Sequence, residues 1–211
     1  VKVLKRYGFG IVDQILAPSP DRLPEEEQGC GCFRQCGGCA FRHNAYDAEL
    51  KIKENAVRDA FRRLGGFGLE PLPILGAPSA DRYRNKAQYP LGRDRDGRIV
   101  AGFYARNSHR IVPAEDCPLQ PVIFSEILRL VLDFLNAHRL PVYEEGTGKG
   151  DYRHVYLREA PATGEVMLCM VASRENPPGM RELAEKVQAA FSEVVSVYLN
   201  INPEKTNVIL G

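Results

Sequence analysis

Four cysteines lie within ten residues of one another, in a loop that has no helical or strand periodicity. They are Cys30, Cys32, Cys36 and Cys39. Crowded thiols in an intracellular protein are seldom disulfides and commonly bind metal. In the Cys36-Gly-Gly-Cys39 turn two thiolates are directed at one centre, and the glycines leave backbone N–H groups free to face sulfur. This pair predicts a chelate that needs two further ligands.

The two remaining cysteines have different settings. Cys117 precedes a proline, as the fourth ligand of ferredoxin-like sequences does, so it can complete the ligand set together with Cys30 or Cys32. Cys169 lies within the apolar segment 166–171, where a free cysteine packs as a small hydrophobic residue and is usually inert. We therefore interpret Cys169 as a core residue.

The cysteine spacing leaves three kinds of site open. A zinc ribbon normally has two Cys-x-x-Cys knuckles, and only one is present. A radical-SAM site would use Cys32, Cys36 and Cys39, but it also requires repeated βα units after the loop, where hairpins are expected. A closed [4Fe–4S] cluster held by Cys30, Cys36, Cys39 and Cys117 meets every ligand requirement and is favoured over zinc.

A basic segment is the second candidate site. Residues 82–110 contain eight Lys or Arg and two Asp, a net charge of +6 in a chain whose total is +1. Amide and aromatic side chains interleave with the cations, a combination that suits phosphates and unpaired bases, although we expect the rings to serve mainly the core. The predicted RNA-binding residues are Arg82, Arg84, Asn85, Lys86, Gln88, Arg106, His109 and Arg110.

Two other features carry weaker signals. The glycine-rich string 145–150 is similar to a nucleotide-binding loop, but such a loop should open a helix, whereas residues 151–159 indicate a strand. We interpret the string as a flexible loop. His43 and His154 are expected to make ordinary hydrogen bonds in the core or at the surface.

Hydrophobic periodicity and breaker residues predict the elements that position these side chains. Asn44 is the expected N-cap of the first helix, and Asp96-Gly97 marks a hairpin turn. The second half predicts an α+β fold with an antiparallel or mixed sheet and helices on one face. The expected strands are 2–6, 10–16, 83–91, 98–105, 153–159, 165–172 and 194–201, and the expected helices are 45–64, 121–137 and 178–191.

Composition restricts the class of protein. The chain is 44% hydrophobic and 26% charged, which indicates a globular protein rather than a disordered or fibrous one. It has no apolar stretch long enough to span a membrane and no apolar block typical of a signal peptide, so we expect a cytoplasmic protein without a membrane partner. Both ends have the character of cut ends, so the sequence is expected to belong to a longer protein.

An ordered series of motifs resembles the uracil-5 RNA methyltransferases of the iron–sulfur, ribosomal-RNA branch. The resemblance covers most of the chain, and residues 17–22 and 197–211 are similar to the exit from the small TRAM β-barrel and to the end of the central region in such enzymes. It implies four segments: the end of a β-barrel at 1–22, the cluster loop at 23–44, a helix and basic hairpin at 45–120, and an α+β domain at 121–211. The motifs are Cys30, 36–39, His43, Tyr46, Leu50, Lys53, 83–86, 102–104, 108–109 and Cys117.

The resemblance implies methyl transfer from S-adenosylmethionine to C5 of a uridine in 23S ribosomal RNA. A cysteine thiolate adds to C6, C5 takes the methyl group, and a base removes the C5 proton from a flipped-out nucleotide. In such enzymes the catalytic residues and the cofactor site lie in a C-terminal domain that has no counterpart here. We therefore assign no catalytic residue and expect the chain alone to be inactive. The implied cofactor is a [4Fe–4S] cluster and the implied partner is ribosomal RNA, with no obligate protein partner.

Two other functions fit the same residues. One is a self-sufficient iron–sulfur or zinc module that binds RNA, and the other is a fragment of a radical-SAM enzyme. The radical-SAM alternative predicts that Cys30 and Cys117 are dispensable, whereas the closed cluster requires both.

Overall fold

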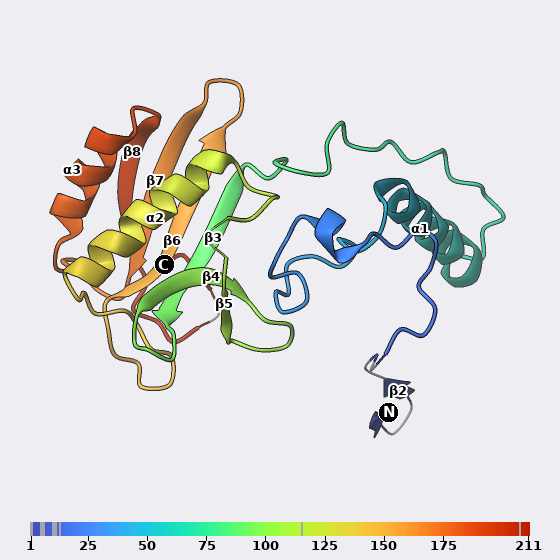
Figure 1. Cartoon of the computed structure of the whole chain (residues 1–211), viewed down its shortest axis with the longest axis horizontal. Helices are drawn as coiled ribbons and strands as arrows, with labels where there is room; N and C mark the ends of the chain where they lie inside the picture. The colour runs from blue at the N-terminus through green and yellow to red at the C-terminus, as the bar shows by residue number, and fades with distance from the viewer. Residues whose placement is uncertain (1, 5–6, 10–11, 13, 115, 207) are drawn as a thin grey trace. The chain divides into compact units, whose positions relative to one another are not determined.

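A computed structural model describes residues 2–4, 7–9, 12, 14–114, 116–206 and 208–211 (Figure 1). The chain forms two compact units. One comprises residues 1–28 and 41–76, and the other comprises residues 29–40 and 77–211. The cysteine loop therefore belongs to the same unit as the basic segment.

The larger unit is built on a mixed six-stranded sheet with the strand order β5-β4-β3-β6-β7-β8. Neighbouring strands are antiparallel except for β7 and β8, which are parallel and are connected through a helix. A parallel pair needs such a crossover because a tight turn cannot return the chain to the same end of the sheet. The strands are β3 Lys86–Arg93, β4 Ile99–Tyr104, β5 Ile111–Pro113, β6 Tyr152–Ala160, β7 Glu165–Ala172 and β8 Val194–Ile201.

Two helices, α2 (Val122–Ala137) and α3 (Met180–Ala190), cover one face of this sheet (Figure 1). Their apolar stripes pack against alternate residues of the strands and form the core. Each fully buried Leu or Phe contributes roughly 1.5–3 kcal/mol to folding. The α+β class and the placement of the helices are as the sequence predicts. The largest fully buried side chains include Tyr89, Phe124, Leu128, Tyr152, Leu168 and Leu183.

The β4–β5 pair approaches closely at Gly102. A Cβ on Gly102 would lie 1.9 Å from the carbonyl oxygen of Val112, a separation that no side chain can occupy. The glycine therefore allows the three-residue strand β5 to pair with β4. The sequence did not predict β5, because three residues are too few to show an alternation of apolar and polar side chains.

The hairpin β3–β4 forms around residues 94–98. The Asp94 carboxylate accepts the backbone N–H groups of Asp96 and Arg98, and Gly97 has a positive φ of 79°. This Asx-type turn confirms the hairpin signal. The strand begins at Lys86 rather than at residue 83, because the residues before it bond instead to the segment around Pro118.

The smaller unit contains a two-stranded antiparallel hairpin, β1 (Lys2–Leu4) and β2 (Tyr7–Phe9). The second strand was expected at 10–16, so its predicted position was wrong, and residues 10, 11 and 13 lie outside the described part of the chain. A short 3₁₀ turn follows at Glu25–Gln28. Whether these strands belong to a β-barrel stays a prediction.

The long helix of the smaller unit is α1 (Tyr46–Asp59), which continues as a π-helical turn over Ala60–Leu64. Its bounds match the predicted 45–64. The N-cap residue is Ala45 and makes no side-chain cap bond, so the predicted Asn44 cap was wrong. Ala48 is the buried residue of α1, and the apolar side chains of Val57, Phe61 and Leu64 are exposed, because the described residues of this unit supply few side chains to cover them.

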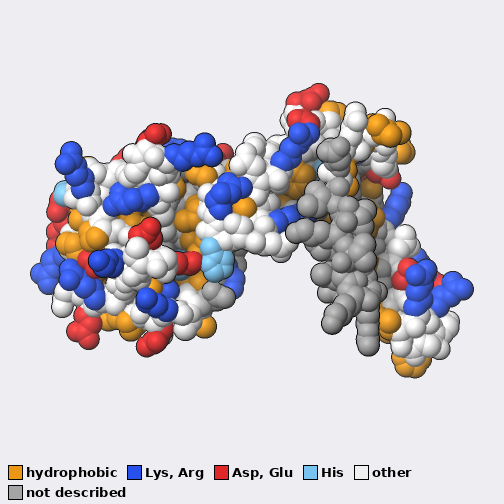
Figure 2. All heavy atoms as spheres, turned by 90° about the horizontal axis from the view of Figure 1, so that it is seen from below, with side chains coloured by type: hydrophobic (Ala, Val, Ile, Leu, Met, Phe, Trp, Pro, Cys, Tyr) orange, Lys and Arg blue, Asp and Glu red, His pale blue; other side chains and the backbone are white. Residues whose placement is uncertain are grey.

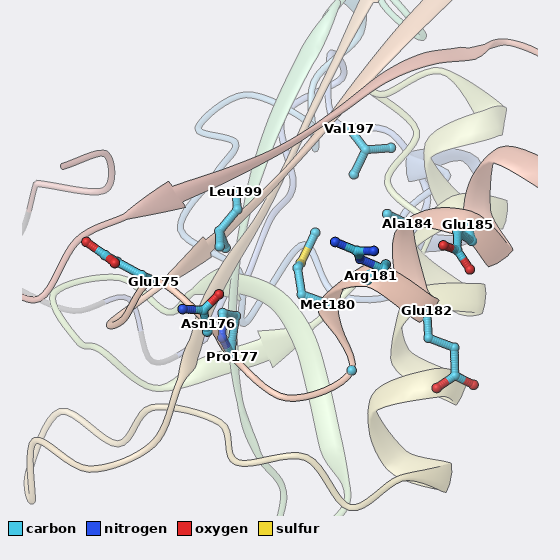
Figure 3. Close-up of a pocket in the computed structure, with 11 residues that line it drawn as sticks. Glu175, Asn176, Pro177, Met180, Arg181, Glu182, Ala184, Glu185, Val197 and Leu199 are labelled. Carbon is cyan, nitrogen blue, oxygen red and sulfur yellow. The ribbon is translucent and has the colours of Figure 1, made fainter.

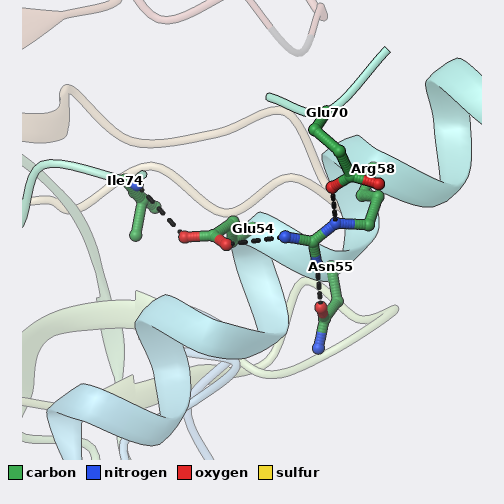
Figure 4. A network of polar contacts seen from close by, with 5 residues as sticks. All are labelled: Glu54, Asn55, Arg58, Glu70 and Ile74. Carbon is green, nitrogen blue, oxygen red and sulfur yellow. Dashed lines mark hydrogen bonds and ion pairs between the residues drawn. The ribbon is translucent and has the colours of Figure 1, made fainter. Parts of the chain in front are cut away.

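A polar network fastens the segment after α1 to the helix (Figure 4). The Glu54 carboxylate accepts the backbone N–H of Ile74 at 3.2 Å and a guanidinium N–H of Arg58 at 2.8 Å. The same guanidinium donates to Glu70 at 2.7 Å. The Ile74 N–H, and then Arg58, lower the pKa of Glu54 below its ordinary 4.5. Two stretches of the chain are therefore joined through one carboxylate.

This network predicts a pH-dependent contact. Because the folded pKa of Glu54 is lowered, the contact is fully present above pH 4.5 and is lost as the pH falls below 4.5 and through the folded pKa. The Ile74 amide resonance should report the transition, and Glu54→Gln should abolish it. Glu70→Gln is the control, because Glu70 does not contact Ile74. A parent-like transition in Glu54→Gln would contradict the assignment.

No helix in the described part of the chain is long and apolar enough to cross a membrane.

Candidate functional site

The cysteine loop is attached to the end of strand β4. Cys36 forms an isolated bridge with Ala105, and the Gly37 N–H donates to the Tyr104 carbonyl at 3.0 Å. Cys117 lies four residues beyond the end of β5, the neighbour of β4. The β4–β5 pair therefore places Cys36 and Cys117, which are distant in sequence, in the same unit.

The five thiols of this region interact electrostatically. Burial, and then the charge of Cys30 and a hydrogen bond with it, raise the pKa of Cys32 to about 11. Burial raises the pKa of Cys39, and Cys117 adds to that effect. The pKa of Cys117 is also raised, chiefly by burial, with Cys30 and Cys36 contributing. Thiols this close keep one another protonated unless a cation is present.

Backbone N–H groups face two of the sulfur atoms. The Gly38 N–H donates to Cys36 Sγ at 3.3 Å, as the Cys-Gly-Gly-Cys turn predicts. The Leu119 N–H donates to Cys117 and lowers its pKa against the effect of burial. N–H···S bonds of this kind stabilise thiolates that bind metal. They are the local preparation that a metal ligand needs.

The thiols do not surround a common centre in this structure. Among the described residues, no three His, Cys, Asp or Glu side chains meet in the geometry of a metal site. The residues fit a cysteine-ligated group in donor type, in neighbourhood and in the N–H bonds to sulfur. Where metal binding and folding are coupled, a metal site is commonly completed only when the metal binds.

Two arginines that the sequence assigned to RNA also belong to the cysteine site. Burial raises the pKa of both Cys39 and Cys117, and the positive charge of Arg84 opposes part of that rise. Arg82 has a positive φ of 56°, and its guanidinium donates to the carbonyl oxygens of Cys117 at 3.1 Å and of Gln120 at 2.8 Å. These bonds hold the Cys117 loop and offset the cost of the left-handed backbone. Side-chain types alone gave no signal of this second role.

Arg106 and His109 line a hollow of about 750 Å³ beside the cysteine loop. Arg106 donates to the Cys39 carbonyl at 3.0 Å. His109 Nδ1 lies 2.6 Å from Glu145 Oε2, and its ring stacks on Tyr104 with 5.2 Å between centroids. Arg110 is exposed. The structure therefore groups three of the predicted RNA-binding residues in the segment that joins β4 to β5.

The other predicted RNA-binding residues lie at the start of β3. Lys86 is exposed and is paired across the sheet with Arg158 of β6, and Gln88 is half-buried opposite Tyr156. The Asn85 carbonyl accepts the Glu159 N–H at 2.8 Å. The sequence missed Arg158, because strand register between β3 and β6 was needed to place it beside Lys86.

The aromatic residues of the basic segment divide between core and surface. Tyr89 is fully buried, and its ring lies 5.2 Å from that of Phe103, which packs against the core. Both confirm the expected core role. Tyr83 is exposed, so the core interpretation was wrong for that residue. Basic and acidic side chains are interspersed over the face that Figure 2 shows, so a dominant basic patch is not visible there.

The glycine-rich string forms a tight turn and opens no helix. The Glu144 N–H donates to the Lys149 carbonyl and the Gly148 N–H donates to the Glu144 carbonyl, both at 2.8 Å. Strand β6 follows directly. This geometry lacks the helix N-terminus that cradles phosphates in nucleotide-binding loops. The one side chain of the string with a link to the candidate site is Glu145, through His109.

Two further side chains of the sheet, Cys169 and His154, are buried. Cys169 is buried, as predicted. His154 is also buried, but its Nδ1 has no hydrogen-bond partner, so the expectation of ordinary hydrogen bonding was wrong for that atom. Burial, and then the charge of Arg153, lower the pKa of His154 to about 4.

A separate hollow of about 670 Å³ lies between α3 and β8 (Figure 3). Met180, Val197 and Leu199 supply apolar walls. Three carboxylates and one guanidinium surround them, a balance that disfavours a polyanion. The charged residues that line it are Glu175, Arg181, Glu182 and Glu185.

Comparison with known proteins places the whole chain beside RNA methyltransferases. An uncharacterized RNA methyltransferase of Halalkalibacterium halodurans is 39% identical over 212 residues, and one of Clostridium tetani is 36% identical over 211 residues. Each match covers 100% of this chain and 45% of the relative. No protein-family model matches the chain.

A solved structure has the same fold. The crystal structure of the Pyrococcus abyssi tRNA (uracil-54, C5)-methyltransferase in complex with S-adenosyl-L-homocysteine aligns with a TM-score of 0.66 and 24% sequence identity. The alignment covers 94% of this chain and 42% of that protein. The chain is thus similar over its full length to bacterial proteins named RNA methyltransferases, and it spans just under half the length of each.

Proposed function

We propose that this chain is the cluster-binding and RNA-binding region of an S-adenosylmethionine-dependent uracil-5 methyltransferase that acts on 23S ribosomal RNA. The observation that carries the proposal is the assembly of Cys30, the Cys36–Cys39 turn, Cys117 and Arg84 in one unit, with basic residues of the β3–β4 hairpin beside them. The names of the bacterial relatives support RNA methylation, and the name of the Pyrococcus abyssi enzyme supports uracil C5 as the target.

In this proposal Cys30, Cys36, Cys39 and Cys117 hold a [4Fe–4S] cluster. When bound, a cluster with four thiolate ligands supplies a compact cross-link between the loop and the sheet. The Gly38 and Leu119 N–H groups stabilise the thiolate charge. Arg84 adds a positive charge that offsets part of the negative charge gathered there.

The RNA-binding role falls to the exposed basic residues of the same unit. Lysine and arginine side chains contact phosphates and give affinity, whereas Asn85 and Gln88 can read the edges of unpaired bases. The methyl-transfer chemistry and the S-adenosylmethionine site are assigned to the part of the relatives' length that this chain does not span.

The proposal predicts that Lys86→Ala combined with Arg110→Ala weakens binding to a ribosomal RNA stem-loop. Both side chains are exposed, and neither side chain makes a hydrogen bond or ion pair to another part of the described chain, so the fold should be unaffected. Each lost contact to a single-stranded phosphate should also reduce the slope of log K against log salt by about 0.7. Fluorescence anisotropy at several salt concentrations measures both effects.

The control removes the same amount of charge from the helices. Arg129 of α2 and Arg181 of α3 lie on the helical side of the sheet, and the double alanine variant of these residues should bind RNA as the parent does. Equal binding by the parent and the Lys86→Ala, Arg110→Ala variant at low salt would refute the assignment of RNA binding to this region.

A further inference from the structure

The face of the sheet opposite the helices displays its own ordered rows of side chains. Residues paired across neighbouring strands point to the same face. Ala87 pairs with Leu157, and both are buried in the core against the helices, so the alternate positions of these strands face the other way. One row on that second face is Lys86, Arg158, Met167 and Ser196, and the next is Gln88, Tyr156, Cys169 and Tyr198.

Two like charges stand directly opposite each other in the first row. Lys86 and Arg158 are antiparallel partners, so their Cβ atoms are about 5 Å apart. Among the described residues, neither Lys86 nor Arg158 forms an ion pair with an acidic side chain. Like charges in this position destabilise a sheet unless an anion lies between them. The arrangement therefore favours the binding of a phosphate group.

An aromatic ring is available in the second row. Tyr198 is 56% exposed, on the edge strand β8, whereas Tyr156 in the same row is buried. The exposed ring of Tyr198 offers a flat surface on which an unpaired base can stack. Arg158 on β6 and the Tyr198 ring on β8 are two strands apart, on one continuous face.

A hollow of about 350 Å³ adjoins the cation pair at the end of β6. Asn85, Arg158 and Met167 are among its lining residues, and so are Glu159 and Glu165. The two carboxylates disfavour a phosphate inside this hollow. They can accept hydrogen bonds from the amino groups of a base, as acidic side chains do when they read cytosine.

We propose that the second face of the sheet binds an unpaired RNA segment, with one phosphate between Lys86 and Arg158 and a base stacked on Tyr198. This inference rests on the proposed function and extends it from the β3–β4 hairpin to β6 and β8. Duplex RNA fits this face poorly, because its bases are stacked inside the helix and offer no free ring surface to Tyr198.

Substitutions at Tyr198, Arg158 and Arg129 in the 211-residue chain test the proposal with a fluorescein-labelled, unstructured uridine-rich 12-mer RNA. Tyr198→Ala should weaken binding at least about fivefold, the low end of base–aromatic stacking, whereas Tyr198→Phe should retain it. Arg158→Ala should weaken binding and lower the salt slope by about 0.7, and Arg158→Lys should restore both. Arg129→Ala, on the helix face, is the matched charge control.

Thermal unfolding shows whether a substitution weakens RNA binding directly or by destabilising the fold. Arg158→Ala should melt at or above the parent temperature, because it removes the repulsion from Lys86. Parent-like affinity of both Arg158→Ala and Tyr198→Ala would overturn the inference, as would tighter binding of a matched RNA duplex. If Arg110→Ala, which leaves Lys86 in place, still loses affinity in that case, the proposed function stands without this surface. If no variant loses affinity, both fail.

Discussion

Replacing Cys30, Cys36, Cys39 or Cys117 by serine is expected to give a colourless chain without bound iron, whereas the parent prepared anaerobically binds about four iron atoms per chain and is brown. A [4Fe–4S] centre needs four thiolates, and a serine hydroxyl is too weakly acidic to replace one. Iron and sulfide analysis together with visible absorbance measures the effect. Exchanging one sulfur atom for oxygen is thus expected to remove the whole cluster, the largest effect expected of any single substitution in this chain.

Two other cysteines provide the controls. Cys169→Ser should retain the cluster because Cys169 is buried in β7, away from the loop. Cys32→Ser is the more demanding control, because Cys32 hydrogen-bonds with Cys30 and lies among the proposed ligands. If Cys32→Ser retains iron, the result supports the closed cluster and excludes a site that uses Cys32, Cys36 and Cys39 as its ligands. Stoichiometric zinc without iron in the parent, or iron retained by Cys117→Ser, would contradict the ligand assignment.

The second large effect is a loss of stability in mild acid that originates at His154. Its pKa is lowered from 6.5 to about 4, first by burial and then by the charge of Arg153. Between these two pH values His154 therefore stays unprotonated in the folded state, whereas it binds a proton in the unfolded chain. The free energy of unfolding should fall as the pH drops from about 6.5 to about 4, by about 3 kcal/mol in total. Urea denaturation followed by circular dichroism across this range measures the slope.

His154→Leu should reduce the fall in the free energy of unfolding between pH 6.5 and about 4. The substitution also removes the Nδ1 atom that is buried without a partner, so it should not cost stability at neutral pH through a lost hydrogen bond. His138→Leu is the control, since the His138 side chain is 43% exposed and its loss should leave the pH profile of the parent. If the stability of His154→Leu falls with decreasing pH as that of the parent does, the role of this imidazole is refuted.

The regular elements of the larger unit could be predicted from the sequence with good accuracy. Leu183 and Val187 of α3 are fully buried, as the helical spacing predicts, and β7 has the predicted bounds 165–172. In a long amphipathic segment many apolar residues follow the same helical or strand period, so one residue that departs from the period does not change the prediction. Strand β5 and the position of β2 were missed because three-residue strands depend on partner strands and leave no periodic trace.

The candidate site could be predicted only as a set of residue types. Cysteine spacing suggested the ligands, since the chemistry of sulfur is local to the motif. The partnership of Arg84 with Cys39 and Cys117, and of Lys86 with Arg158, depends on strand register and on loop–strand hydrogen bonds between distant residues. A single sequence carries no record of register, so these pairings became visible only in three dimensions.

Gly102 has a consequence for how mutations in this protein would be interpreted by a geneticist. It lies outside the cysteine motifs, yet any side chain there would collide with the Val112 carbonyl and force β5 away from β4. The bridge from Cys36 is fixed to the end of β4, whereas Cys117 follows β5. Separating the two strands would pull the proposed ligands apart. An allele at Gly102 should therefore share its phenotype with ligand alleles, although all six cysteines are intact.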